Sequence, residues 1–277
     1  MARYWLTTEC FGDGSDGAKT VSSDETYDGA NASCSGTSGE TALTLGAAST
    51  FANNDLVLIH QSRGTGVGNW ELNKISSGGG GTSLTMSYAL QNTYTDSGAS
   101  QAQVIELKQY SAVTVDSGQV WSSPQWAGDV GGIIAFMCSG TVTVTGTIRT
   151  IGTGFVGGTG VGDSAGKQGE GTAAAGDTVS NANNGNGGGG ANSSNQGGAG
   201  GGHGTAGTNK GGATGGIAVG LADLTEMNIG GSGGSGDDHA TGATVSGRGG
   251  DGGGITAIFC RTISVTGSIQ ATGNDGG

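Results

Sequence analysis

The chain has 277 residues, of which 64 are glycine, and its formal net charge is −12. Nucleic acid is therefore not an expected partner, because binding to phosphates requires clustered lysine and arginine, and the ten basic residues here are scattered. Apolar residues make up 33% and aromatic residues 5% of the chain, so any side-chain core must be thin and the fold must depend on backbone hydrogen bonds.

Membrane insertion is not expected either. No apolar run approaches the roughly 18 to 20 residues of a membrane helix, and the first residues lack the apolar stretch of a secretory signal. We therefore expect synthesis in a cytoplasm. The sequence stops at Gly277, where a second glycine tract would begin, so truncation and a natural end both remain open.

Residues 1–48 are predicted to form a polar N-terminal segment. The run GDGSDG at residues 12–17 faintly resembles a calcium loop, but it lacks the full acidic pattern and the closing glutamate, so a turn is favoured. Cys10 and Cys34 both lie in this segment and are the favoured pair if the chain carries a disulfide.

Residues 49–130 are predicted to form a β domain. Residues 55–60 are a compact apolar run, and residues 83–90 alternate apolar with polar side chains, as a half-buried strand does. Similar runs follow without a convincing helix between them, which favours a β-sandwich or a small barrel. Trp121 and Trp126 fall in a loop, where they either cap the sheet, the favoured interpretation, or grip a ligand such as a sugar.

Two copies of one apolar motif frame the rest of the chain. The first copy covers residues 131–148 and the second covers residues 253–269, and they align with one gap, which places Ser139-Gly140 opposite Arg261. Both copies are predicted to be β-strands in equivalent environments. Cys138 and Cys260 occupy equivalent positions and are expected to be buried.

Between the two copies lies a tract dominated by glycine, which completes a third predicted domain, residues 131–277. One interpretation is a flexible linker. The favoured one is an ordered bundle of polyglycine II-like segments, because glycine recurs every third residue in patches and Ile217, Leu221, Leu224 and Ile229 interrupt the tract with apolar side chains. The predicted fold class is therefore all-β, with a sandwich or barrel followed by this bundle.

Groupings typical of enzymes are absent from the sequence. The three histidines stand apart from any nucleophile motif, the GxSxG elbow is missing, and the cysteines lack the CxxC spacing of zinc sites. We therefore expect no enzyme activity, no cofactor and no metal site. Glycoside hydrolysis stays open as a minor alternative, because paired carboxylates can lie far apart in sequence.

Several phrases resemble glycine-rich virion and surface proteins of bacteriophages and uncultured bacteria. These phrases are residues 55–64 (DLVLIHQSRG), 70–73 (WELN), 93–94 (TY), 102–105 (AQVI) and 131–136 (GGIIAF). The glycine tract is similar to the tail-fibre tip adhesins of T-even-like phages. That resemblance implies a rigid core of stacked polyglycine II helices and receptor contacts in the loops between them.

The function expected from this resemblance is attachment of a virion to a host-cell glycan or outer-membrane protein, as part of a homo-oligomer with other virion subunits. The alternative is an extracellular or cell-surface protein that assembles into filaments or a sheath. Receptor contacts are expected in polar interruptions of the glycine tract. The candidates are Asn181, Asn183, Asn184, Asn192, Asn195, Asp237, Asp238 and His239.

Overall fold

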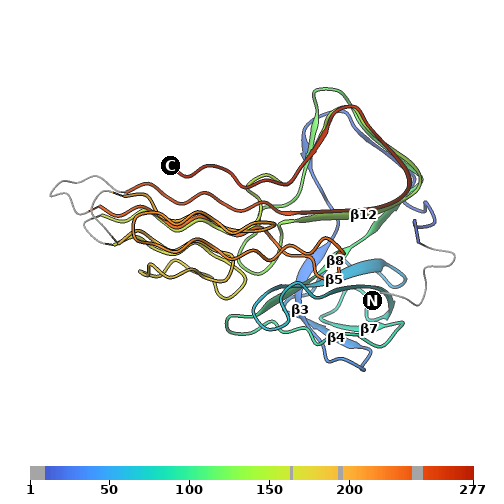
Figure 1. The fold of residues 1–277 in the computed structure, drawn as a ribbon. Coiled ribbons are helices and arrows are strands. Elements are labelled where there is room, and N and C mark those ends of the chain that lie inside the picture. The colour runs from blue at the N-terminus through green and yellow to red at the C-terminus, as the bar shows by residue number, and fades with distance from the viewer. Residues whose placement is uncertain (1–9, 163–164, 193–195, 239–245) are drawn as a thin grey trace.

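The computed structural model describes residues 10–162, 165–192, 196–238 and 246–277. Within these ranges the chain forms fifteen β-strands and no α-helix, which confirms the all-β class. The strands form one closed antiparallel barrel and two parallel sheets. Figure 1 shows the barrel below the parallel sheets and the glycine-rich region projecting away from both.

The barrel is built from six strands. Its closed order is β3 (Asn31–Ser35), β4 (Ala42–Leu45), β7 (Ser83–Met86), β6 (Trp70–Ser77), β5 (Leu56–Arg63) and β8 (Gln101–Glu106). Alternating side chains such as Leu43, Leu45, Leu84 and Met86 fill its interior. The small-barrel interpretation is therefore confirmed, although two of its strands come from the segment expected to be polar.

The remaining strands form four strand–turn–strand units, which we call rungs 1 to 4. Rung 1 is β1 (Ala18–Val21) with β2 (Glu25–Thr26), and rung 2 is β10 (Ala112–Val115) with β11 (Val120–Ser122). Rung 3 is β12 (Ile133–Val144) with β13 (Thr147–Arg149), and rung 4 is β14 (Ile255–Val265) with β15 (Ser268–Gln270). The rungs stack in parallel in that order, and β9 (Lys108–Tyr110) also pairs with β12.

Equivalent residues of successive rungs lie side by side. Val21, Val115, Val144 and Val265 form one such column. The two motifs found in the sequence pair from Ile133–Ile255 onward, and the register shifts after Cys138, where the sequence alignment has its gap. The prediction that both motifs are β-strands is therefore confirmed.

The structure settles the state of the cysteines and shows one expectation about them to be wrong, the burial of Cys260. All four cysteines are free, so Cys10 and Cys34 do not form a disulfide. Cys34 lies on β3 and points into the barrel core, whereas Cys10 is half-buried outside it. Cys138 is fully buried, but Cys260 is only half-buried, because rung 4 is the last rung of the stack within the described part of the chain.

A second core joins the barrel to the rungs. The outward residues Leu56, Leu58 and Ile105 of the barrel pack in one cluster with β12, which explains why β5 is buried on both faces. Trp121 and Trp126 belong to this cluster, and the ring of Trp121 lies 5.0 Å from that of Phe136. Both indoles are buried, so the interpretation that they grip a ligand is wrong.

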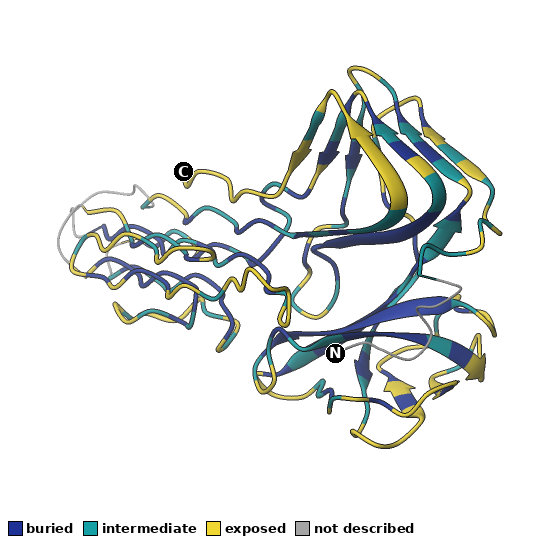
Figure 2. Ribbon diagram, turned by 45° about the vertical axis from the view of Figure 1, so that its right-hand side comes forward, coloured by how far each residue is buried: buried dark blue, intermediate teal, exposed yellow. Residues whose placement is uncertain are grey.

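The glycine-rich region connects β13 to β14 and spans the described residues between 150 and 254. Its extended segments run side by side, as Figure 1 shows. Residues 271–277, which follow β15, lie along the same region and donate hydrogen bonds to Asp251 and Arg248. Figure 2 shows that the innermost of these segments are buried although they carry few side chains.

Candidate functional site

Backbone hydrogen bonds hold the glycine-rich region together with a spacing of three residues. The central segment, residues 229–237, shows the pattern most clearly. The N–H groups of Gly230, Gly233 and Gly236 donate to the carbonyls of Gly253, Gly250 and Gly247 in the segment before β14. The intervening N–H groups of Gly231, Gly234 and Asp237 donate to Gly202, Ala199 and Gln196. Each face of the central segment is thus bonded to a different neighbour.

The interior of this region has no room for side chains. A Cβ on Gly231 would lie 1.8 Å from the carbonyl oxygen of Asn186, and one on Gly234 would lie 2.0 Å from that of Gly189. Such distances are far below van der Waals contact, so only glycine fits these positions. The glycines of the interior therefore serve close backbone packing.

Two buried polar side chains of β5 connect the glycine-rich region to the barrel. The guanidinium of Arg63 is paired with the carboxylate of Glu170, which also accepts a hydrogen bond from the N–H of Val156 at 3.1 Å. Burial raises the pKa of Glu170. The Nε2 atom of His60 lies 2.8 Å from the carbonyl oxygen of Met227, and burial lowers the pKa of His60 to about 4. His60 is therefore neutral near pH 7 and acts in the structure as a hydrogen-bonding link.

Three of the predicted receptor-binding residues lie at or near the surface of the glycine-rich region. Asn181 and Asn192 are exposed, and Asn183 is half-buried. The amide nitrogen of Asn183 donates to the carbonyl of Gly215 at 3.1 Å. The side chain of Asn181 is bonded only weakly, to the carbonyl of Gly212 at 3.4 Å. The structure thus leaves Asn181 and Asn192 able to contact a ligand.

Three other predicted residues are buried, so the expectation that they face outward is wrong. The amide nitrogen of Asn184 donates to the carbonyls of Gly169 and Ala174, and this side chain stabilises a turn. Asp237 and Asp238 are also buried. Asn195 and His239, the last two candidates, lie outside the described residues.

Sequence reasoning missed a polar cluster at the surface of the glycine-rich region. The ammonium of Lys167 lies 3.1 Å from the carboxylate of Asp177 and 3.0 Å from the hydroxyl of Thr159. Partial burial acts in the opposite direction, but hydrogen bonds from Thr159 and the pairing with Lys167 lower the pKa of Asp177. Val179, beside this cluster, is exposed. Nothing in the sequence spacing brings these residues together, because Thr159 and Asp177 lie on different segments.

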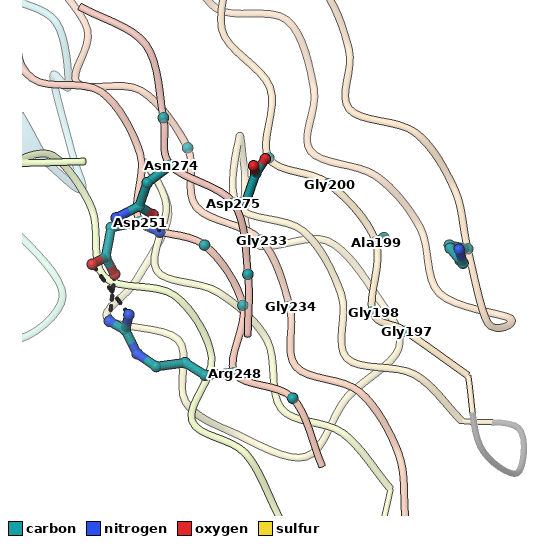
Figure 3. Close-up of a pocket in the computed structure, with 18 of the residues that line it drawn as sticks. Gly197, Gly198, Ala199, Gly200, Gly233, Gly234, Arg248, Asp251, Asn274 and Asp275 are labelled. Carbon is teal, nitrogen blue, oxygen red and sulfur yellow. Dashed lines mark hydrogen bonds and ion pairs between the residues drawn. The ribbon is translucent and has the colours of Figure 1, made fainter. Parts of the chain in front are cut away.

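A groove with a volume of about 1060 Å³ runs along one side of the region. Its walls are residues 197–204, 230–236 and 247–254, together with the final segment 271–277. Figure 3 shows that backbone forms most of this lining, with the ion pair of Arg248 and Asp251 at one side. A groove of this composition offers peptide groups to a ligand, and few side chains.

The described residues contain no cluster of three or more metal-ligating side chains. No helix in the described ranges is long and apolar enough to span a membrane. Comparison with known proteins gives no match to a family model, to a curated protein or to a solved structure.

Proposed function

We propose that this chain is a non-enzymatic structural protein of a virion, a tail-fibre or tip adhesin that attaches to a host-cell surface. The barrel and the rungs form its base, and exposed polar segments of the glycine-rich region carry the receptor-binding surface. The partner is a glycan or an outer-membrane protein of the host, and the protein acts together with other virion subunits.

The observation that carries this proposal is the three-residue spacing of the hydrogen bonds around residues 229–237. A polyglycine II helix has three residues per turn, so it presents its N–H groups along three rows to surrounding segments. We infer that the region is a polyglycine II-like bundle, which is rigid and narrow. Such a bundle supports exposed segments at a distance from the base, as an attachment organ requires.

The exposed side chains of the glycine-rich region favour a polar ligand. Asn181 and Asn192 offer amide donors and acceptors, and Thr159, Lys167 and Asp177 add hydroxyl and charged groups. Amides and hydroxyls suit the hydroxyl groups of a glycan. Asparagine and serine supply adaptable hydrogen bonding at surfaces that recognise diverse partners.

Open-ended filament assembly at the cell surface, the alternative function, has less support. Head-to-tail stacking would require both ends of the rung stack to be open. At rung 1 the ammonium of Lys19 lies 2.7 Å from Glu25 and 6.0 Å from the ring centroid of Trp121, so that end carries a charged pair where rung 4 carries the apolar Ile263.

Binding of the purified, fluorescently labelled chain to a panel of intact bacterial cells tests the proposal. We expect saturable binding to some members, competed by their isolated surface polysaccharide or outer-membrane fraction. A variant with Asn181, Asn183 and Asn192 changed to alanine is expected to lose binding. Gln91→Ala, an exposed polar change on the barrel, serves as the matched control. Equal binding by the triple variant and the control would contradict the proposal.

A further inference from the structure

The last rung has an exposed apolar edge. Ile263, Val265 and Ile269 are 44%, 44% and 39% exposed, whereas the residues paired with them in rung 3 are fully buried. Those buried partners are Val142, Val144 and Ile148. In rungs 1 to 3 the neighbouring rung covers these positions, so rung 4 presents a surface shaped for another rung.

This edge is also nearly uncharged in a strongly acidic chain. Between residues 252 and 274 only Arg261 carries a formal charge. Among the described residues, no further strand pairs with the backbone N–H and C=O groups on the outer side of β14. An uncovered, apolar edge strand of this kind is a template for the addition of a strand.

The groove of the glycine-rich region is continuous with this edge. Gly253 and Gly254 line it and lead directly into β14, and Ala271 lines it and directly follows β15. A segment that preceded an added rung would therefore enter the groove, just as residues 246–254 precede rung 4.

The groove presents rows of backbone N–H groups to which an extended glycine-rich segment would supply carbonyl acceptors. Within the described part of the chain, the N–H groups of Gly247, Gly250 and Gly253 donate no hydrogen bond, and these residues form a row with three-residue spacing. The N–H groups of Gly198 and Gly201 on the opposite wall donate none either. Elsewhere in the region such rows donate to carbonyls of a neighbouring segment, so these rows lack one neighbour.

The space around Gly233, which lines the groove, also indicates a missing neighbouring segment. A Cβ on Gly233 would meet its nearest atom, the amide nitrogen of Gly250, only at 3.4 Å. The chain itself therefore does not require glycine at this position. A further backbone packed against Gly233 would require it.

We propose that the edge of rung 4 and the groove together bind a partner polypeptide that carries the same unit. This partner supplies a glycine-rich extended segment followed by a strand–glycine turn–strand with β-branched inward residues. Its strand adds in parallel to β14, covers Ile263, Val265 and Ile269, and its glycine-rich segment lies in the groove. This inference concerns assembly and does not depend on host attachment.

Titration of the full chain with a labelled synthetic peptide tests the inference. The peptide has the sequence of residues 246–270, which combines the glycine-rich segment and the rung, and fluorescence anisotropy under reducing conditions measures its binding. We expect saturable 1:1 binding. A peptide with serine at the positions of Ile263, Val265 and Ile269 is expected not to bind.

Variants of the full chain locate the binding site. Val265→Lys on the edge and Gly233→Ala in the groove are each expected to weaken peptide binding by about tenfold or more, with unchanged thermal unfolding. Leu221→Lys, at an exposed apolar position away from the edge, is the matched control and is expected to bind as the wild type does.

Three results would overturn the inference. One is the absence of peptide binding to the wild-type chain. Another is equal binding by Val265→Lys and the control. The third is concentration-dependent dimerisation in analytical ultracentrifugation that Val265→Lys abolishes, because the occupant of the edge would then be a second copy of the folded chain.

Discussion

Cys138 and Cys260 lie opposite each other in the parallel pair β12–β14, and the backbone register shifts immediately after them. Cys138 is fully buried and Cys260 is only half-buried, although both occupy the same place in the repeat. The difference arises from position in the stack, because rung 3 has a neighbour on each side and rung 4 has one.

Thiol labelling should reproduce this difference. We expect a polar alkylating reagent to modify Cys10 and Cys260 in the native chain, and to leave Cys34 and Cys138 unmodified until the chain unfolds. Burial raises the pKa of the thiols of Cys34 and Cys260, but only Cys260 remains partly accessible. Mass spectrometry of tryptic fragments identifies the modified sites. Fast native labelling of Cys34 would contradict the barrel core described above.

The valine column gives a second test of the rung stack. Val144→Ala removes two methyl groups from a fully buried site and should lower the free energy of unfolding by about 2 kcal/mol. Val265→Ala makes the same change at the exposed edge and should cost less than about 1 kcal/mol. Urea unfolding followed by tryptophan fluorescence measures both, and equal losses would argue against the assigned order of rungs.

The sequence predicted much of the strand content and little of its pairing. The alternation in residues 83–90 and the duplicated motif are patterns within short stretches of sequence. Both predicted β-strands, and the structure has strands in these stretches. The strand at residues 112–115 was predicted, but rungs 1 and 2 were not recognised as copies of the motif. Lys19 and Trp121 stand at positions where the later rungs carry Val or Ile. Closure of the barrel depends on pairing between β3 and β8, which lie far apart in the chain.

The candidate site shows a similar limit. Asn183 and Asn184 are adjacent and chemically identical, yet one is half-buried and the other is buried at a turn. The burial of each side chain depends on the carbonyl groups to which it donates, those of Gly169, Ala174 and Gly215. The local sequence does not predict where these carbonyl groups lie. Composition could therefore indicate polar segments in the glycine-rich region without separating surface residues from structural ones.

Adjacent glycines in the central segment should respond differently to alanine. Gly234→Ala would place a Cβ 2.0 Å from the carbonyl oxygen of Gly189, and we expect a loss of stability of about 1 to 3 kcal/mol or more. Gly233→Ala meets no atom closer than 3.4 Å and should stay within about 1 kcal/mol of the wild type. Thermal unfolding of the two variants, compared under identical conditions, decides this. Similar destabilisation of both would speak against the packing of residues 229–237.

Acid should weaken the link between the barrel and the glycine-rich region through His60. Its pKa is about 4 in the folded chain against an ordinary value near 6.5, so the unfolded chain binds the proton more readily. The contribution of neutral His60 is fully present above pH 6.5 and is lost as the pH falls towards 4. It amounts to about 3 kcal/mol.

Replacing His60 with glutamine should flatten this part of the pH profile. Glutamine keeps a hydrogen-bonding side chain and does not titrate, so the difference between wild type and variant isolates the histidine. Urea unfolding at intervals between pH 7 and pH 4 supplies the comparison. Parallel profiles for the two proteins would show that His60 does not titrate as its burial implies.

The central claim is that the glycine-rich region is a folded scaffold, and amide hydrogen exchange tests it most directly. NMR on the native chain should show strong protection for Gly230, Gly233 and Gly236, whose N–H groups are bonded. Within one neighbouring segment, Gly249 and Gly252 should be protected, whereas Gly250, which donates no bond in the described structure, should exchange rapidly. Exchange at random-coil rates throughout residues 229–238 and 246–254 would contradict the claim, because the region would then be a linker.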